Sequence, residues 1–337
     1  MIDGTRVVVV VPAFRVLGRI ERVLEAMPAI VDAIVVVDDA SPDDVGSVIS
    51  ELRMPRVLVV RNERNLGVGG ATVTGFKAAM DAGADIVVKC DGDGQMDPGD
   101  IPKLLLPILE GRADHVKASR LRHFQALRTM PWLRFVGNVG LTFLAKIATG
   151  YWNVVDPVNG FVATRAQTLK RLPLDRLSRR YFFETDLLGR LNEIEARVEE
   201  VPLPARYGGE ESSLSSWKEL FRFPPLLAVC LVRRVFWRYL FYDVSPVAVF
   251  GLSGVTLMAF GFVFGVVEWM KNGLRGVPTP LGSIMLAALP AILGFQALLQ
   301  AVAWDIQAVP RPGLRQGPGD GNEIEERRPS GGADGGR

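Results

Sequence analysis

The sequence is poor in cysteine and carries almost no net charge, and each shortage excludes a class of protein. Its two cysteines, Cys90 and Cys230, lie far apart in segments of different character. They match no zinc-ligand or disulfide spacing, so we expect two free thiols in a reducing compartment. The 39 basic and 37 acidic residues leave a formal net charge of +2. No global field attracts nucleic acid, which we therefore do not expect as a partner.

Three signatures of familiar protein classes are also absent. Residues 1–6 carry an acidic side chain and run straight into a valine-rich segment, which is unlike a secretory signal, so we expect a cytoplasmic first domain. The first apolar run ends in Pro12-Ala13-Phe14 rather than in the glycine fingerprint of a dinucleotide-binding domain. The glycine-rich residues 67–75 contain no Gly-Lys-Ser or Gly-Lys-Thr, which excludes a P-loop. Their small side chains predict instead a helix start that packs closely on its neighbours.

The first half of the chain does contain a regular alternation of short β-branched runs and helical patterns. The expected strands are residues 7–11, 34–37, 57–60, 86–88 and 115–118. The expected helices are residues 17–27, 45–52, 68–80 and 101–109. This order predicts the α/β class, with a mostly parallel sheet covered by helices on both faces. Ligands of such sheets bind beyond the carboxyl ends of the strands.

Polar clusters follow three of the expected strands and should converge on one rim of the sheet. Pro12-Ala13-Phe14 follows the first strand, and residues 38–44 (Asp-Asp-Ala-Ser-Pro-Asp-Asp) follow the second. An acidic turn, residues 89–98 (Lys-Cys-Asp-Gly-Asp-Gly-Gln-Met-Asp-Pro), follows the fourth. The rim is therefore the expected place of a binding site.

The acidic turn is the most informative segment of the chain. In an extended segment alternate residues share a face, so Asp91 and Asp93 should point the same way. Two oxygen ligands of this kind suit Mg²⁺ or Mn²⁺, which fill their other positions with water and substrate phosphate oxygens. A solvated turn is the alternative, because Asp, Gly and Pro are also ordinary turn formers. Asp97 is expected to serve the turn before Pro98 and the next helix start.

The second half of the chain is strongly apolar. Hydrophobic residues make up 48% of the sequence, which is high for a purely soluble protein and indicates a membrane part. Residues 247–267 carry no charge and, at about 1.5 Å per residue, span about 30 Å of hydrocarbon. Residues 281–304 form a second uncharged run, interrupted by Pro290, which a membrane helix tolerates. A buried core helix is the alternative for either run alone, but two runs in succession predict a transmembrane hairpin.

The cations around the two runs predict their orientation. They are Arg222, Arg233, Arg234 and Arg238 before the first run, Lys271 and Arg275 between the runs, and Arg311 and Arg315 after the second. By the positive-inside rule both ends of the hairpin should be cytoplasmic. Residues 214–242 mix these arginines with aromatic residues, which predicts interfacial helices on an anionic leaflet. A linker helix packed on the soluble domain is the alternative.

We therefore expect four parts. Residues 1–213 form a cytoplasmic domain, residues 214–244 are interfacial amphipathic helices, residues 245–305 hold two transmembrane helices, and residues 306–337 are a disordered tail. The expected location is the cell (inner) membrane, with multiple passes and both termini in the cytoplasm.

Seven motifs follow one another along the chain: residues 11–14, 37–43, 65–67, 91–98, 118–120, 156–161, and 201–202 with 206–210. Family 2 glycosyltransferases carry such motifs in the same order. The chain resembles the polyprenyl-phosphate branch of that family and is similar to dolichyl-phosphate mannose synthases and undecaprenyl-phosphate glycosyltransferases. The motifs cover roughly residues 5–216. The resemblance implies a nucleotide-sugar-transferase fold of GT-A type, with a Rossmann-like sheet. Phe14-Arg15 stands where the family often has Tyr-Asn-Glu.

The resemblance also implies roles for single residues. The nucleotide of a GDP- or UDP-hexose would be bound by Pro12, Ala13, Phe14, Asp38 and Asp39, with Asp91 and Arg206 also on the nucleotide sugar. The divalent cation, Mg²⁺ or Mn²⁺, would be held on the donor diphosphate by Asp91, Asp93 and Gln95. The cation would neutralise charge on the departing nucleoside diphosphate.

Asp156 matches the presumed base of the family and, with Asp93, is the expected catalytic residue. The acceptor implied is a polyprenyl phosphate, whose second pKa of about 6 leaves it largely dianionic at neutral pH. Asp156 could therefore position a group instead of removing a proton, and both roles stay open. Arg120 and Arg134 are expected to bind the lipid phosphate and the diphosphate, since guanidinium groups bind phosphate oxygens bidentately.

The expected function is therefore an inverting, metal-dependent transfer of a hexose to undecaprenyl or dolichyl phosphate. A processive polysaccharide synthase is one alternative, but such enzymes carry a Gln-x-x-Arg-Trp motif, and none occurs here. A catalytically silent scaffold that binds nucleotide sugar in the membrane is an alternative from a different class. Self-association into a homo-oligomer is also left open.

Overall fold

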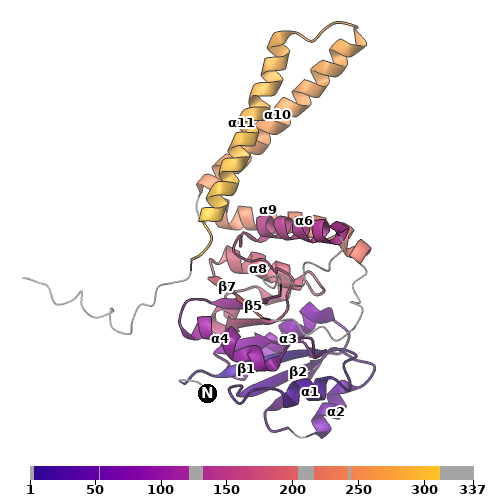
Figure 1. Cartoon of the computed structure of the whole chain (residues 1–337), viewed down its shortest axis with the longest axis vertical. Helices are drawn as coiled ribbons and strands as arrows, with labels where there is room; N and C mark the ends of the chain where they lie inside the picture. The colour runs from indigo at the N-terminus through magenta and orange to yellow at the C-terminus, as the bar shows by residue number, and fades with distance from the viewer. Residues whose placement is uncertain (1–3, 53, 121–131, 204–215, 242–243, 312–337) are drawn as a thin grey trace, which may run out of the picture.

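The computed structural model describes residues 4–52, 54–120, 132–203, 216–241 and 244–311. Three layers follow one another along the long axis of the molecule (Figure 1). An α/β domain forms one end, and α6 (Trp132–Thr149) and α9 (Ser216–Phe236) lie side by side across it. From this layer rises a hairpin of two long helices, α10 (Pro246–Leu274) and α11 (Leu281–Gln307).

The α/β domain is built on one seven-stranded sheet with the order β3-β2-β1-β4-β6-β5-β7. The strands are β1 (Val7–Ala13), β2 (Ala33–Asp38), β3 (Val57–Arg61), β4 (Ile86–Lys89), β5 (His115–Ser119), β6 (Val162–Arg165) and β7 (Val198–Pro202). Strand β6 is antiparallel to β4 and β5, and the other pairs are parallel. The five strands expected from the sequence are confirmed within one or two residues at each end, except that the sheet is mixed and contains two further strands.

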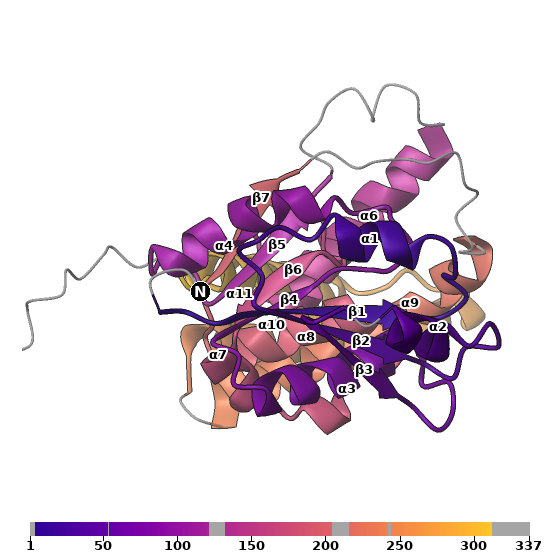
Figure 2. The same ribbon diagram turned by 90° about the horizontal axis from the view of Figure 1, so that it is seen from below.

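Helices cover both faces of the sheet, as the strand–helix order predicted (Figure 2). The helices of the domain are α1 (Ile20–Glu25), α2 (Val45–Glu51), α3 (Gly67–Asp81), α4 (Ile101–Leu109), α7 (Ala166–Lys170) and α8 (Phe183–Glu193), with short 3-10 turns η1 (Pro98–Asp100) and η2 (Leu174–Arg176). The expected helix over residues 17–27 is shorter at both ends than predicted. The other three expected helices are confirmed within one residue.

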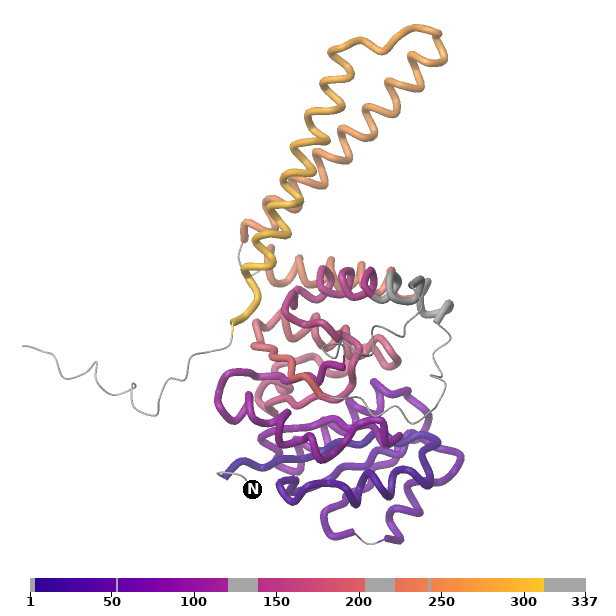
Figure 3. The backbone as a smooth tube through the Cα atoms, in the orientation of Figure 1, coloured from indigo at the N-terminus to yellow at the C-terminus, as the bar shows by residue number. Residues whose placement is uncertain are grey.

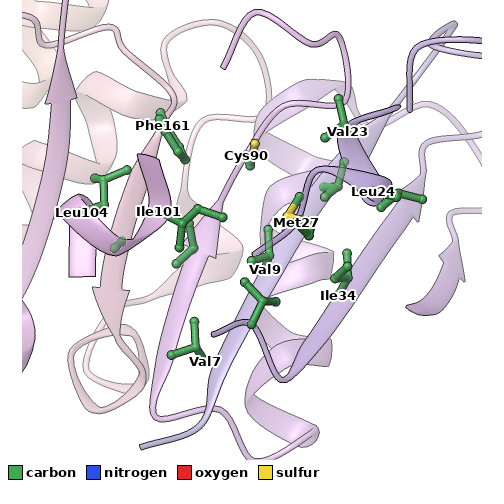
Figure 4. Close-up of a cluster of buried hydrophobic side chains, with 14 of the residues drawn as sticks. Val7, Val9, Val23, Leu24, Met27, Ile34, Cys90, Ile101, Leu104 and Phe161 are labelled. Atoms are coloured by element: carbon green, nitrogen blue, oxygen red, sulfur yellow. The ribbon is translucent and has the colours of Figure 1, made fainter. Parts of the chain in front are cut away.

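Alternating residues of the buried strands pack into two separate hydrophobic cores, one on each face of the sheet. Val7, Val9 and Val11 of β1 pack with α1 and α4 on one face (Figure 4). Val8 and Val10 point to the other face, where they pack with α3 and α8. Because both faces of β1 are buried, every residue of the strand is apolar, as central parallel strands require. This double core fixes the position of the strand ends that carry the polar clusters.

Helix α3 lies unusually close to the sheet, as its small residues predicted. A Cβ atom added at Gly75 would lie 2.1 Å from Cγ1 of Val10, and one at Gly69 would lie 2.3 Å from the carbonyl oxygen of Ser178. Real side chains cannot approach so closely, so glycine is required at both positions. The helix is thereby held between the sheet and the segment that leads into α8.

Helix α9 is bound to the domain by apolar packing and by arginines. Phe223, Leu227 and Cys230 form a small core with residues of α6 and with Phe182. Val229, Val232 and Phe236, spaced along one face of α9, are exposed. The sequence predicted an interfacial helix on an anionic leaflet, with a linker helix packed on the domain as the alternative. Three arginines of this segment make internal contacts: Arg233 with Asp186 and Glu193, Arg234 with Asp305, and Arg238 with Asn192 and the Ala308 carbonyl.

The two expected membrane runs lie inside α10 and α11, which are both long and apolar enough to cross a membrane. Their backbones approach closely at small residues (Figure 3). A Cβ atom at Gly261 would lie 2.5 Å from the Ala287 carbonyl oxygen, and one at Gly294 would lie 2.8 Å from the Gly254 carbonyl oxygen. Close helix contacts at small residues are typical of membrane helix pairs. Most of the large apolar side chains of the hairpin face outward.

Candidate active site at the carboxyl ends of the strands

The three polar clusters meet at one edge of the sheet. In the parallel pairs of the central strands, Ala13 lies beside Asp38 and Val10 beside Lys89. The chain stays paired just past the strands, because Asp39 N donates to the Ala13 carbonyl at 3.0 Å and Cys90 N to the Val10 carbonyl at 3.0 Å. The predicted convergence at this rim is therefore confirmed.

Asp39 holds a neighbouring turn in place. Its carboxylate accepts hydrogen bonds from Asn62 Nδ2 at 2.7 Å, Leu66 N at 2.9 Å and Gly67 N at 2.8 Å. The carboxylate is buried and lies at the start of α3, where free backbone N–H groups need acceptors. Asp39 thus fixes the segment from β3 to α3. The sequence did not reveal this contact, because Asn62 follows the next strand along the chain, β3.

The loop after β1 is held by the loop after β2. Arg15 N donates to Ser41 Oγ at 2.7 Å, and Ser41 N donates to Asp38 Oδ1 at 2.8 Å. Arg15 has a positive φ of 55°, a backbone conformation that non-glycine residues rarely adopt. Its guanidinium carbon lies 5.3 Å from the centre of the exposed Phe14 ring. An aromatic ring and a cation are therefore presented together beside the two buried aspartates.

A buried lysine lies beneath the acidic turn. Lys89 is fully buried, and its Nζ lies 2.8 Å from Asp91 Oδ1 and 3.3 Å from Glu184 Oε1. A Cβ atom at Gly160 would lie 2.4 Å from this Nζ, so no side chain fits there. Burial favours the neutral amine, but the two carboxylates outweigh it and raise the pKa of Lys89 above its usual value. Lys89 is therefore a permanent positive charge that fixes Asp91.

Asp93 is the second carboxylate of the turn. It accepts a hydrogen bond from Gln95 N at 3.0 Å. Burial raises its pKa; the Gln95 hydrogen bond opposes this rise, and the Asp91 charge adds to it. Added positive charge would thus stabilise the ionised form. Asp97 instead accepts from Gly99 N at 3.0 Å and caps η1 beside Pro98, as predicted.

The donor atoms of the turn fit a hard divalent cation that is completed by substrate. Among the described residues, no three His, Cys, Asp or Glu side chains gather as ligands, so the protein alone offers only a partial shell. Asp91 and Asp93 supply two carboxylates, and the exposed Gln95 an amide oxygen. Mg²⁺ in enzymes is commonly held by one or two carboxylates together with water and phosphate oxygens. The turn matches this pattern.

The structure brings together two residues that the sequence singled out separately, Asp156 and Arg120. Arg120 Nε donates to Asp156 Oδ2 at 2.9 Å, and its Nη2 lies 3.3 Å from Oδ1. Asp156 N in turn donates to Glu200 Oε1 at 2.7 Å. Burial raises the pKa of Glu200, while the backbone donors at Asp156 and Val155 oppose this rise. Both oxygens of Asp156 thus face the guanidinium fork.

Lys117 is a buried residue of the site that the sequence analysis missed. Its Nζ donates to the Asn159 carbonyl oxygen, and burial lowers the pKa of Lys117 to about 8. Lys89 and Lys117 both pair with Val162 of β6, so they lie in one row across the sheet. A lysine in the middle of an expected buried strand, between Val116 and Ala118, was the available signal.

Two expected phosphate-binding residues cannot be placed. Arg206 lies outside the described residues, and Arg134 lies on α6 in a turn whose side chains are also outside the description. Two acidic residues in the first turn of α8, Glu184 and Asp186, bind cations of different segments, and Asp186 lies 2.8 Å from Arg233 Nη2. Glu184 binds Lys89 instead.

Comparison with known proteins gives a consistent result. The model of the family described as Glycosyl transferase family 2 matches residues 8–172. The chain is similar to the UDP-N-acetylglucosamine–dolichyl-phosphate N-acetylglucosaminyltransferase of Methanococcus voltae, with 34% identity over 190 residues, covering 52% of this chain and 75% of that protein. It is 30% identical over 205 residues to the undecaprenyl-phosphate mannosyltransferase of Micrococcus luteus, covering 59% of this chain and 82% of that protein.

A solved structure shares the fold. Glucosyl-3-phosphoglycerate synthase from Mycobacterium tuberculosis, crystallised with Mn²⁺, uridine diphosphate and glucosyl-3-phosphoglycerate, superimposes with a TM-score of 0.50 at 23% identity. The match covers 69% of this chain and 80% of that one. The α/β domain therefore has the GT-A-like fold that the family resemblance implied, with a mixed sheet in place of the mostly parallel one expected from the strand–helix order.

Proposed function

Because the chain belongs to glycosyl transferase family 2, we propose that it is a membrane-anchored inverting enzyme that transfers a hexose from a GDP- or UDP-sugar to a polyprenyl phosphate. One observation carries the proposal: the acidic turn and the Arg120–Asp156 pair lie at one edge of the sheet, in a chain that also contains a long apolar hairpin. The relatives named for dolichyl- and undecaprenyl-phosphate transfer support the acceptor class.

The loops after β1 and β2 suit the nucleotide. We assign the exposed ring of Phe14, with Pro12 and Ala13, to the base, since an aromatic face accepts a stacked base. Asp38 holds the loop after β2 through Ser41, and Asp39 holds the adjoining segment from β3 to α3 through Gly67. Their role in nucleotide binding is thus to shape the pocket as well as to offer carboxylate oxygens.

Asp91, Asp93 and Gln95 would hold Mg²⁺ or Mn²⁺ on the donor diphosphate. When bound, such an ion neutralises charge on the leaving nucleoside diphosphate. Lys89 keeps Asp91 in one orientation from below, at 2.8 Å, so that the turn is ordered before the ion arrives. The Mn²⁺ named with the M. tuberculosis structure supports a divalent requirement.

The transfer itself needs a nucleophile and cations. An oxygen of the acceptor phosphate attacks the anomeric carbon, the bond from that carbon to the diphosphate oxygen breaks, and the nucleoside diphosphate leaves with the bonding electrons. The phosphate is already largely dianionic at pH 7, so little deprotonation is required. Because Asp156 faces Arg120 with both oxygens, we assign it the positioning role, with Arg120 directed at phosphate. Arg134 and Arg206 are proposed as further phosphate-binding cations.

The membrane arrangement follows from the hairpin. We propose that residues 1–213 form the cytoplasmic transferase domain, residues 214–244 lie at the membrane interface and residues 245–305 cross it twice, with both termini cytoplasmic. The exposed apolar faces of α9 and of α6 support the interfacial part. The tail begins after α11, and residues 312–337 of it lie outside the described residues.

The decisive experiment is a screen of UDP- and GDP-sugars with undecaprenyl or dolichyl phosphate and Mg²⁺ or Mn²⁺. Products are followed by mass spectrometry of the lipid. A single sugar on lipid phosphate supports the proposal, a growing glycan identifies a polysaccharide synthase, and binding without turnover identifies a scaffold. Asp93→Asn should abolish transfer. Asp97→Asn is the matched control, because asparagine also caps a helix and this residue belongs to the turn.

A further inference from the structure

The last turn of α11 carries a buried aspartate that collects donors from three other segments. Asp305 Oδ1 lies 2.6 Å from Arg234 Nη1 and accepts from Tyr239 OH at 2.6 Å. Its Oδ2 accepts from Trp152 Nε1 at 2.8 Å and lies 3.2 Å from Arg234 Nη2. These four residues, Trp152, Arg234, Tyr239 and Asp305, are called the Asp305 joint below. They come from the loop after α6, from α9, from η3 (Trp237–Phe241) and from α11.

Arg234 extends the joint to the end of α6. Its side chain is 2% exposed, and it donates through Nη2 to the Ile147 carbonyl at 2.8 Å and through Nε to the Ala148 carbonyl at 3.1 Å. These are carbonyls of the last helical turn, which lack partners within the helix. A Cβ atom at Gly150 would lie 2.4 Å from Arg234 Nη1. The guanidinium thus lies between the ends of α6 and α11 and its own helix α9, in a space that a side chain at position 150 would fill.

The same loop that meets Asp305 leads to the active site. Trp152 stands four residues before Asp156, and its neighbours bind the segment around β7 on the other side of the loop. Tyr151 OH donates to the Ala196 carbonyl at 2.6 Å, and Asn153 Nδ2 donates to the Val198 carbonyl at 2.9 Å. The loop is therefore clamped between the sheet and the cytoplasmic end of the hairpin.

We propose that the Asp305 joint is a positioning device, which fixes the height and angle of the Asp156–Arg120 pair above the membrane surface. The inference rests on the proposed function, because it concerns where a membrane-embedded lipid phosphate meets the donor sugar. A buried charge with four hydrogen-bonded contacts has one arrangement, whereas apolar contacts alone tolerate sliding. Beside the joint lies a small apolar cluster that includes Tyr239, Val247 and Ala248, and Arg238 adds hydrogen bonds to Asn192 and to the Ala308 carbonyl.

The test compares an acceptor that is embedded in a membrane with one that is soluble in water. Asp305→Asn and Trp152→Phe are assayed in nanodiscs with undecaprenyl phosphate, and in detergent with a short, water-soluble prenyl phosphate. We expect kcat/KM for the embedded acceptor to fall by roughly 10- to 100-fold. The KM for nucleotide sugar and the rate with the short acceptor should stay within about twofold of the unmodified protein. Equal losses with both acceptors, or no loss with either, would overturn the proposal.

Two controls keep the result interpretable. Asp175→Asn makes the same chemical change at an exposed ion pair with Lys77 and should alter neither acceptor. If Asp305→Asn fails to fold, Trp152→Phe still decides, because it removes one donor and keeps an aromatic ring against Phe143.

A structural measurement separates the joint from the proposed function. Spin labels at two exposed positions, Leu299 on α11 and Glu195 beside β7, report the distance between hairpin and domain. The distance distribution should broaden in Asp305→Asn and remain narrow in Asp175→Asn. An unchanged distribution overturns the joint, whereas failure of the unmodified protein to transfer sugar to any prenyl phosphate overturns the proposed function alone.

Discussion

Replacing Lys89 with methionine tests whether a buried ammonium holds the acidic turn in place. Methionine keeps the apolar stem but leaves Asp91 and Glu184 without the cation that lies 2.8 and 3.3 Å from them. Removing one member of a buried ion pair costs about 3–5 kcal/mol. The side chain of Asp91 is 26% exposed and can recover some hydration, so we expect a loss near the lower limit, about 3 kcal/mol.

The pH at which the loss is measured follows from the sign of the shift. The two carboxylates raise the pKa of Lys89 above the value of 10.5 that it has when unfolded, although burial alone would lower it. Its contribution to stability is therefore fully present at neutral pH and is lost only as the pH rises through the higher folded value. Melts at pH 7 thus report the whole effect.

Thermal unfolding of the detergent-purified protein is the assay. A loss of about 3 kcal/mol corresponds to a fall in Tm of roughly 6–12 °C. Lys77→Met is the matched control, because it removes the same ammonium from the exposed pair with Asp175, which is worth about 0–1 kcal/mol. Mn²⁺ should raise the Tm of Lys89→Met more than that of the unmodified protein, because the ion replaces the missing positive charge. A ligand at about 100 times its Kd adds about 2.7 kcal/mol to the free energy of unfolding. Equal losses in the two lysine variants would refute the argument.

Three further predictions address the same domain. Burial lowers the pKa of Lys117 to about 8, so between pH 8 and about 10.5 the unfolded chain binds a proton that the folded chain does not. The free energy of unfolding should therefore rise by roughly 3 kcal/mol as the pH increases across this window. Melts of Lys117→Met should lack this rise. Asp156→Asn should lower kcat by about 100-fold without removing the acidic limb of the pH–rate profile, whereas loss of that limb would identify a base. Gly75→Ala should cost about 1–3 kcal/mol through the contact with Val10, while Gly140→Ala, which meets nothing within 4 Å, should not destabilise the fold.

The sheet was predictable where local pattern decides and unpredictable where distant segments meet. Strands β1 to β4 are runs rich in β-branched residues, which the local sequence pattern reveals. Strand β6, Val162–Arg165, has four residues and inserts antiparallel between β4 and β5. Nothing in its local sequence specifies that insertion, because the choice depends on pairing with strands far away in the chain.

The site shows the same division. The acidic turn and Asp156 could be found from their spacing and chemistry, because each motif is local. Lys89 meets Glu184 across 95 residues, and Arg234 meets Asp305 across 71, so neither contact could be read from pattern. The arginines before the hairpin were interpreted as part of an interfacial helix on an anionic leaflet, because cations mixed with aromatic residues fit such a helix. In the fold, buried carboxylates compete for them, and a desolvated charge requires such a partner more than an exposed one does.

The charges gathered at the site support the divalent cation independently of the motif. Around the acidic turn and the Arg120–Asp156 pair, the carboxylates Asp91, Asp93, Asp156, Glu184 and Glu200 outnumber the cations Lys89, Lys117 and Arg120. The buried Asp38 and Asp39 lie at the same rim of the sheet and add to this excess of carboxylates. Burial raises the pKa of Asp93 and of Glu200, and the neighbouring charges of Asp91 and Asp156 add to the rise. We therefore propose that a divalent ion at Asp91 and Asp93 offsets part of this excess, and that a donor diphosphate that arrives with the ion is balanced by further cations. Arg134 and Arg206 are the residues we assign to that task, so their loss should weaken donor binding more than it weakens binding of the metal alone.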